Sequence, residues 1–303
     1  MKLVNYASSD GAKRLGWMRA EGLVDVAQAC ELMGELPYGE TEILRILETG
    51  GAIDRLRVLS ETFSDLQAKH EDRAESAQVR VEGLRWFAPI AHPEKIVCVG
   101  LNYRDHAEEQ NVQPPAEPLL FAKFPTTVIG HREDVLKPSQ TNQLDYEVEL
   151  GVVIGKLCSR VGEAGALDYV GGYTIVNDIS ARDFQSRDKQ WLRAKSSDTF
   201  APMGPCLVTA DEIKDPHVLT VRMTVNGEER QLSNTRNLIF NVPFLVSFIS
   251  QFITLKPGDV ISTGTPGGVG VFRKPPIFLS DGDKMRAEVE GIGELENRVR
   301  YLS

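Results

Sequence analysis

The fold of this chain is decided by the stretch DYEVELGVVIG at residues 145–155. Its apolar second half predicts a central, buried β-strand. Along a strand, residues i and i+2 lie on one face with their Cα atoms roughly 6.6 Å apart, so Glu147 and Glu149 point the same way. Two ionised carboxylates on a buried face repel each other and are costly to desolvate without a cation. The pair therefore favours a functional site; an edge strand with a solvated acidic face is the alternative.

A third carboxylate, Asp178, belongs to a second apolar strand, GGYTIVNDIS at residues 171–180. It stands where the apolar run ends, just before a predicted helix, and a side chain there can project into a cleft. Three hard oxygen ligands without Cys or His suit Mg²⁺, Mn²⁺ or Ca²⁺ and do not suit Zn²⁺. The sequence therefore predicts a metal site formed by Glu147, Glu149 and Asp178.

The chain on either side of these strands is rich in β-structure. Asn226-Gly227 is the strongest short signal for a hairpin turn and predicts a hairpin over 219–231. The other predicted elements are strands at 95–100 and 259–264, helices at 181–192 and 242–255, and a closing hairpin at 284–302. Regular βαβ alternation and internal repeats are absent from the sequence, which predicts an α+β fold built on antiparallel or mixed sheets.

Residues 1–80 predict a small N-terminal α+β domain. Short β-like runs near the start are followed by segments of helical periodicity at 41–49 and 53–71. The composition changes between residues 70 and 92, and we expect the second domain to span 92–303. The first domain shows no cluster of His, Cys or carboxylate residues, so we expect it to serve packing or oligomerisation.

The composition excludes several classes of protein. The chain has 34 Lys and Arg against 43 Asp and Glu, and this net charge of −9 would repel a nucleic-acid backbone. No apolar run reaches the roughly 18 residues of a membrane span, and the first residues show no secretory signal. Four well-separated cysteines argue against a zinc knuckle or a disulfide framework. We therefore expect a cytoplasmic protein with neither nucleic acid nor membrane as partner.

A histidine beside a carboxylate follows the strand at 95–100. We expect Asn102 to cap a short helix on which His106 and Glu109 are neighbours at i and i+3. A carboxylate at that spacing can fix the imidazole tautomer, as in a general base that activates water. A solvated surface pair is the alternative.

The segment 103–117 runs from this pair into a proline-rich loop. Its low apolar content leaves little buried area to hold it in place without a ligand. We expect a lid that becomes ordered over a bound ligand; a permanently ordered surface helix is the alternative.

Two lysines and a glycine-rich loop complete the candidate site. Lys195 and Lys123 lie in half-apolar stretches and could pair with a substrate carboxylate, although a lysine can also snorkel to the surface. The loop at 263–270 has neither the Rossmann fingerprint nor the lysine of a phosphate-binding loop. We expect its backbone N–H groups, that of Gly264 among them, and the Thr265 hydroxyl to meet an anionic ligand.

Taken together, these motifs resemble the fumarylacetoacetate hydrolase family, in its longer subgroup with a small N-terminal domain. The matching stretches are GLNYRDH, DYEVE, NDISARD and TGTPGGVG, and their order and spacing cover residues 95–303. The resemblance implies a mixed β-roll catalytic fold, usually a homodimer, with Mg²⁺ or Mn²⁺ bound by three carboxylates.

The resemblance also implies a role for individual positions. They are the metal ligands Glu147, Glu149 and Asp178, the dyad of His106 and Glu109, the active-site lysine Lys195, and the loop threonine Thr265. Family members without the histidine tend to be isomerases or tautomerases, so its presence favours C–C cleavage.

The chemistry that follows is metal-dependent cleavage of a C–C bond in a short 2-oxo acid. A 2-oxo acid can chelate the cation through its carboxylate and 2-oxo oxygens, and the cation stabilises the enolate that develops. Oxaloacetate decarboxylation and hydrolysis of an acylpyruvate or fumarylpyruvate both fit this scheme. A keto–enol tautomerase or isomerase of a 2-oxo or 2-hydroxy-dienoic acid is the alternative, and a binding protein that retains a metal site is a third possibility.

Overall fold

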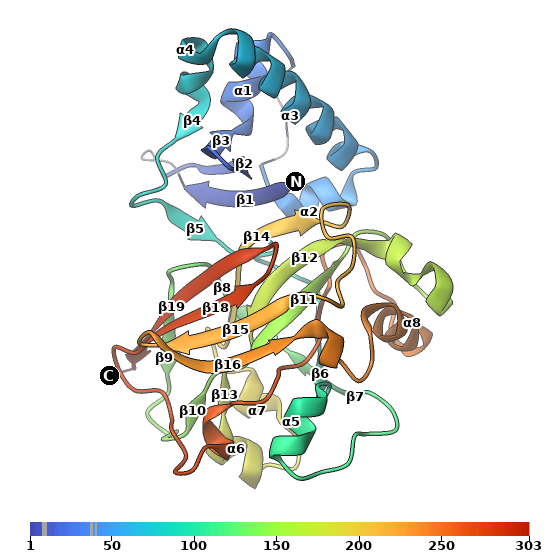
Figure 1. Cartoon of the computed structure of the whole chain (residues 1–303), viewed down its shortest axis with the longest axis vertical. Helices are drawn as coiled ribbons and strands as arrows, with labels where there is room; N and C mark the ends of the chain where they lie inside the picture. The colour runs from blue at the N-terminus through green and yellow to red at the C-terminus, as the bar shows by residue number, and fades with distance from the viewer. Residues whose placement is uncertain (8–10, 37–38, 40, 303) are drawn as a thin grey trace.

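The computed structural model describes residues 1–7, 11–36, 39 and 41–302. Its framework is a large mixed sheet of twelve strands with a five-stranded sheet beside it and helices around the edges (Figure 1). The predicted α+β class and mixed β-roll are confirmed. No helix in the described part of the chain is long and apolar enough to span a membrane.

The large sheet has the order β4-β3-β2-β1-β14-β12-β11-β17-β6-β7, with β5 paired to β1 and β8 paired to β14. Its strands are β1 Lys2–Ala7, β2 Lys13–Arg19, β3 Gly22–Asp25, β4 Gln78–Val79, β5 Arg85–Phe87, β6 Ile96–Gly100, β7 Leu119–Lys123, β8 Val128–Ile129, β11 Val148–Ile154, β12 Val170–Asn177, β14 Ala201–Thr209 and β17 Val260–Ser262. Every residue of β11 and β12 is buried, which agrees with their nearly continuous apolar sequences.

The smaller sheet has the order β16-β15-β18-β19-β9, and it shares one hydrophobic core with the large sheet. Its strands are β9 Asp134–Lys137, β15 Thr220–Val225, β16 Glu228–Asn234, β18 Lys284–Val289 and β19 Gly293–Tyr301, and a separate pair is formed by β10 Leu144–Asp145 and β13 Ser180–Ala181. Both predicted hairpins are confirmed. The turn between β15 and β16 has φ of 53° at Asn226 and 82° at Gly227, as a two-residue hairpin turn with two positive φ values requires.

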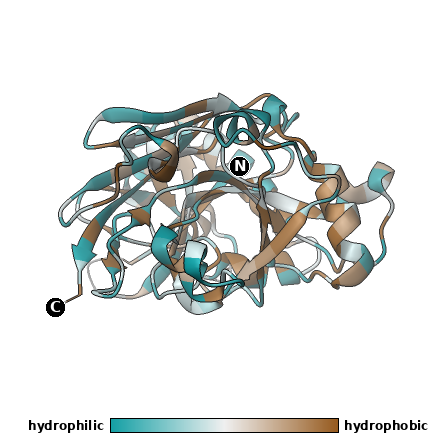
Figure 2. Ribbon diagram, turned by 90° about the horizontal axis from the view of Figure 1, so that it is seen from below, coloured by the Kyte–Doolittle hydropathy of each residue, from teal (hydrophilic) through white to brown (hydrophobic). Residues whose placement is uncertain are grey.

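Helices cover the edges of this framework. They are α1 Val26–Met33, α2 Ile43–Glu48, α3 Ala52–Lys69, α4 Glu71–Ala74, α5 Arg104–Glu109, α6 Arg182–Arg187, α7 Leu192–Lys195 and α8 Val242–Phe252, with short 3₁₀ turns η1 Glu75–Ala77, η2 Pro125–Thr127, η3 Glu163–Tyr169, η4 Thr235–Asn237 and η5 Gly270–Phe272. The helix α8 is rich in hydrophobic residues and is coloured mainly brown on the right side of the view from below (Figure 2). The single helix predicted at 181–192 is wrong, because α6 ends at Arg187 and α7 begins only at Leu192.

One sheet joins the N-terminal part to the rest of the chain. β1 pairs with β14 on one side, and β5, which follows the N-terminal helices, also pairs with β1. A second hydrophobic core contains Leu56 and Phe63 of α3 together with Cys98 and Val176 from the central strands. The N-terminal helices therefore pack against the large sheet. Strand β11 of the same sheet carries Glu149 of the candidate site.

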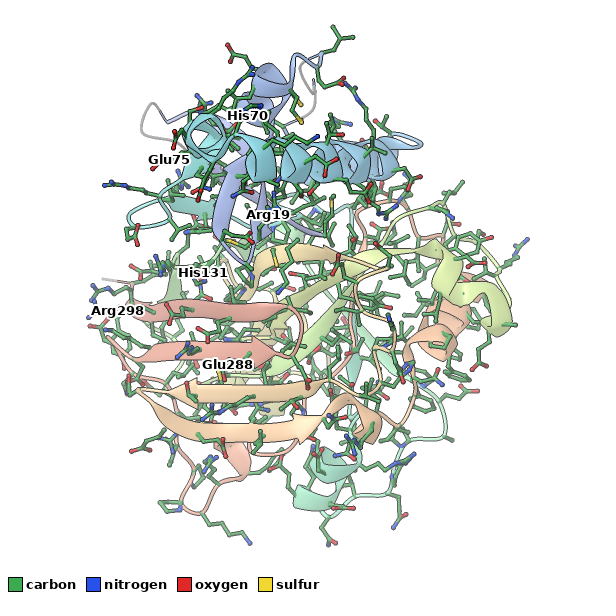
Figure 3. All side chains as sticks on the ribbon, turned by 45° about the horizontal axis from the view of Figure 1, so that its top comes forward. Arg19, His70, Glu75, His131, Glu288 and Arg298 are labelled. Carbon is green, nitrogen blue, oxygen red and sulfur yellow. The ribbon has the colours of Figure 1, made fainter. Side chains whose placement is uncertain are left out.

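The junction between the N-terminal strands and the five-stranded sheet includes His131. Its ring meets the edge of Trp86 with centroids 5.8 Å apart, and its Nδ1 accepts a hydrogen bond of 3.1 Å from the backbone N–H of Glu296. Figure 3 labels His131 between the two layers. This contact ties β5 to β19 through one imidazole.

Candidate active site

Three carboxylates converge where β11 begins and β12 ends. The two strands are antiparallel and Val148 pairs with Asn177, so the residues just outside this pair lie together. Candidate ligand oxygens of Glu147, Glu149 and Asp178 all lie within 4.8 Å of one another, and all three side chains are buried. The alternative of a solvated edge strand is therefore wrong.

Glu149 is held by the glycine-rich loop. Its Oε2 accepts hydrogen bonds from the Ser262 hydroxyl at 2.6 Å and from the Gly264 backbone N–H at 2.8 Å. Gly264 has φ of +102°, and a Cβ there would lie 2.8 Å from Cβ of Asn102. The N–H that we expected to meet a substrate anion is thus directed at a carboxylate of the triad.

Two buried lysines reach the same carboxylates. Nζ of Lys195 donates to Glu147 Oε2 at 2.7 Å and to Asp178 Oδ2 at 2.8 Å. Nζ of Lys123 donates to Asp178 Oδ1 at 2.5 Å and to the Ile179 carbonyl at 3.1 Å. Lys195 lines the pocket described below, whereas neither Lys123 nor Asp178 is among its lining residues, so Lys123 binds Asp178 behind the pocket wall. Neither lysine snorkels to the surface.

Arg182, at the start of α6, is a site residue that we did not predict. Its Nε donates to Asp145 Oδ2 at 2.8 Å, and its Nη2 lies 2.6 Å from Glu147 Oε1. The residue is buried and lines the pocket. It lies in the NDISARD motif, four residues after Asp178. An arginine so close to a predicted metal ligand was the signal in the sequence that could have identified it.

The electrostatics of this cluster fit a divalent cation. Lys123, Lys195 and Arg182 bring three positive charges against four carboxylates, those of the triad and Asp145. With all four carboxyls ionised, one negative charge would remain uncompensated in a buried place. Hard oxygen donors without sulfur or imidazole are the ligands that Mg²⁺, Mn²⁺ or Ca²⁺ prefer.

The pKa values reflect this crowding. Burial, followed by the charges of Asp178 and Glu147, raises the pKa of Glu149 to about 8. Burial also opposes ionisation of Glu147, yet Lys195 and Arg182 outweigh it and hold the pKa of that carboxyl well below its usual range. A cation among the three oxygens would stabilise the ionised form of Glu149 in the same way.

The predicted dyad is formed on α5. Nδ1 of His106 lies 2.6 Å from Glu109 Oε1, and Glu109 Oε2 accepts a hydrogen bond of 2.8 Å from the Gly268 N–H. Asp105 accepts from the Ser233 hydroxyl. The glycine-rich loop and β16 therefore hold the helix that carries the histidine.

The role that we predicted for Asn102 is wrong, because Tyr103 occupies the cap position of α5. The Asn102 side chain instead donates to the Thr263 carbonyl at 2.7 Å and accepts from the Phe240 N–H at 2.8 Å. Asn102 thus joins the glycine-rich loop to the chain that precedes α8.

His106 of the dyad and two of the three carboxylates, Glu147 and Glu149, line one pocket of about 520 Å³. Its polar lining consists of His106, Gln110, Glu147, Glu149, Arg182, Gln185, Ser186, Lys195 and Thr265. Apolar walls come from Phe121, Trp191 and Phe272. The helices α5, α6 and α7 around it lie together at the lower end of the molecule (Figure 1).

Thr265 lines the pocket but its hydroxyl is already engaged. It donates to the Val148 carbonyl at 3.0 Å and accepts from Nε2 of Gln231 at 2.8 Å. Oε1 of Gln231 accepts from the Val148 N–H at 3.1 Å. Gln231, a buried residue of β16, therefore fixes the loop to the acidic strand, and nothing local in the sequence indicated this contact.

Comparisons with known proteins agree with this geometry. A family model, fumarylacetoacetate (FAA) hydrolase C-terminal, matches residues 95–300. Oxaloacetate tautomerase FAHD2A, mitochondrial, from Homo sapiens is 48% identical over 232 residues, which cover 75% of this chain and 74% of the relative. A fumarylacetoacetate hydrolase domain-containing protein 2 homolog from Dictyostelium discoideum is 39% identical over 99% of this chain and 97% of its own length. The solved fumarylacetoacetate hydrolase from Exiguobacterium antarcticum superposes with a TM-score of 0.81, at 33% identity and full coverage of both chains.

Proposed function

The chain belongs to the fumarylacetoacetate hydrolase family, and from this premise we propose that it is a keto–enol tautomerase of a short 2-oxo acid such as oxaloacetate. The observation that carries the proposal is a buried cluster of three carboxylates, two of which, Glu147 and Glu149, line one pocket with Lys195 and Arg182. Family relatives that are 48% identical and named oxaloacetate tautomerase support this substrate class.

We propose Mg²⁺ or Mn²⁺ as the cofactor, held by Glu147, Glu149 and Asp178. Bound there, the cation supplies Lewis acidity to the 2-oxo and carboxylate oxygens of the substrate. Ser262 and Gly264 orient Glu149 for this task, and Lys123 orients Asp178. The site therefore has oriented ligands as well as the right donor atoms.

The chain's own cations carry the rest of the proposed reaction. Keto–enol exchange moves a proton from C3 to the 2-oxo oxygen, and negative charge develops on that oxygen when C3 loses its proton. The ammonium group of Lys195 and the guanidinium group of Arg182 line the pocket, where they stabilise that charge. Water in the pocket can take the C3 proton and return a proton to the 2-oxo oxygen, so this reaction needs no activated nucleophile.

C–C cleavage is the second candidate, and the dyad of His106 and Glu109 favours it. Hydrolysis of an acylpyruvate needs a base that deprotonates the attacking water, and a carboxylate-bound imidazole can act as one. Decarboxylation of oxaloacetate needs no water attack.

Product analysis separates these reactions. Metal-free protein loaded with Mn²⁺ or Mg²⁺ is mixed with enol-oxaloacetate, acetylpyruvate and fumarylpyruvate in parallel. We expect faster loss of the enol absorbance of oxaloacetate than in buffer, without a matching release of pyruvate and CO₂. Lys195→Met should lower this rate at least about 100-fold, the size of effect seen when a preorganised charge donor is removed.

Two results would refute the assignment. Stoichiometric pyruvate and CO₂ from oxaloacetate would make the protein a decarboxylase. Rapid cleavage of acetylpyruvate with no effect on the enol would make it a hydrolase. As a matched control, Lys189→Met changes a lysine of the α6–α7 connection that does not line this pocket, and it should retain the wild-type rate.

A further inference from the structure

Gln110, directly after the dyad, contacts the base from the other side. Its Nε2 lies 2.9 Å from Nε2 of His106, while Nδ1 of His106 faces Glu109 at 2.6 Å. His106 and Gln110 are at i and i+4, a spacing that brings side chains together on one face of a helix. Both ring nitrogens of the imidazole are thus already hydrogen-bonded, and both residues line the pocket.

The proton positions follow from the partners. A carboxylate only accepts, so Nδ1 carries the proton that faces Glu109, and Nε2 has the free lone pair. The amide group of Gln110 donates one of its N–H bonds to that lone pair. An attacking water would have to donate its own O–H to the same lone pair, which has room for one donor.

The backbone under Gln110 is fixed, so only its side chain can release His106. Asn111 N–H donates to the Glu108 carbonyl at 3.0 Å and Val112 N–H to the Ala107 carbonyl at 3.1 Å, with Asn111 at a φ of 55°. This pair of bonds is the Schellman ending of a helix. The ring cannot turn away either, because Phe272 packs against it with centroids 6.0 Å apart and Glu109 is held by Gly268.

We propose that Gln110 is a specificity-determining positioning residue that occupies Nε2 of His106, withholds it from water, and so favours tautomerisation over C–C hydrolysis. The proposal deepens the proposed function and rests on it for the reaction that is favoured. Charge stabilisation by Lys195 and Arg182 does not use Nε2, so it proceeds with the amide in place. Hydrolysis requires the amide to rotate away first.

The test compares Gln110→Ala with Gln140→Ala, a matched control because Gln140 is exposed in a loop and does not line this pocket. The ratio of acetylpyruvate hydrolysis to oxaloacetate tautomerisation should rise about tenfold in Gln110→Ala, which corresponds to one hydrogen bond of about 1.4 kcal/mol. The ratio should stay at the wild-type value in Gln140→Ala. A general loss of folding would lower both rates and leave the ratio unchanged.

A second readout needs no substrate. Diethyl pyrocarbonate acylates the free lone pair of an imidazole, and mass spectrometry can follow His106 against exposed His70 in the same molecule. We expect His106 to react several times faster in Gln110→Ala than in wild type, with His70 unchanged. The double variant Gln110→Ala/His106→Gln should lose the gain in hydrolysis.

The outcomes distinguish the two proposals. Equal acylation of His106 in wild type and Gln110→Ala, or a hydrolytic gain that survives removal of His106, would overturn the role of Gln110. Faster acylation together with absent tautomerisation in wild type would instead overturn the proposed function and leave the contact between Gln110 and His106 intact.

Discussion

At the scale of single residues, the site is defined by the hydrogen bonds and ion pairs that orient its carboxylates. Glu147, Glu149 and Asp178 were identified from strand alternation and from a strand end, both local properties of the sequence. Lys123 was expected at the substrate and instead supports Asp178 from a fully buried position. A half-apolar stretch predicts that a lysine is buried, but the identity of its partner depends on how the strands pair.

The contacts of Gly264 lead to a prediction about backbone conformation. Gly264→Ala places a Cβ against Cβ of Asn102 and 3.0 Å from the Val99 carbonyl, at a φ that L residues rarely adopt. We expect a loss of about 1–3 kcal/mol in the free energy of unfolding, measured by denaturant titration. Mn²⁺ affinity should also fall, because the N–H that orients Glu149 moves. Gly162→Ala, where a Cβ meets open space, is the control, and equal Mn²⁺ affinity in all three proteins would contradict this role.

At the scale of elements, regular periodicity was a reliable guide and irregular ends were not. The hairpin around Asn226-Gly227 and the helix α8 follow directly from turn chemistry and from apolar spacing. The segment 181–192 contains helix-forming residues, yet the helix stops at Arg187, because Asp188 adopts an extended backbone with ψ of 136° and pairs with Arg193. The bonds of Gln231 to Thr265 and Val148 join segments distant in sequence, so no local pattern could reveal them.

The helix α5 leads to a prediction about motion. Asp105 bonds to Ser233 and Glu109 bonds to Gly268, so we expect α5 to stay in place with or without ligand. Because Asn111 and Val112 are held by the helix ending, only the exposed loop at 113–117 is left to act as a lid. Hydrogen exchange with and without oxalate plus Mg²⁺ should show a protected Ala107 amide in both states and ligand-dependent protection confined to the loop. Ligand-dependent protection of α5 itself would restore the larger lid over 103–117.

At the scale of the whole molecule, the N-terminal part and the catalytic part share a sheet and a core. The proposed division into 1–80 and 92–303 follows composition, whereas β1 pairs with β14 across it. A composition shift cannot reveal that two segments extend one sheet. The homodimer and the cytoplasmic location stay predictions of the sequence and of the family resemblance.

His131 at this junction predicts a loss of stability in acid. Burial, with a smaller effect of Arg132, lowers the pKa of His131 from 6.5 to about 4. Because the pKa is lower in the folded state, the neutral ring stabilises the protein above pH 6.5, and this stabilisation is lost as the pH falls toward 4. Between pH 7 and pH 5, His131 should account for about 2 kcal/mol of lost unfolding free energy.

The variant His131→Asn keeps an acceptor for the Glu296 N–H and removes the titration. Denaturant titrations at pH 7 and pH 5 should show a drop in stability smaller by about 2 kcal/mol in the variant than in wild type. His70→Asn, an exposed histidine, is the control. The same drop in all three proteins would show that His131 does not respond to pH in this way.

The central claim is that Glu147, Glu149 and Asp178 hold a divalent cation that also binds a 2-oxo acid. Water-proton relaxation of the Mn²⁺-loaded protein, titrated with oxalate, tests it most directly. We predict one Mn²⁺ per chain in wild type, a relaxation enhancement that oxalate lowers to a plateau as it displaces bound water, and no such Mn²⁺ in a folded Glu149→Gln variant. Mn²⁺ that binds equally well to Glu149→Gln, or that keeps its enhancement at saturating oxalate, would contradict the account.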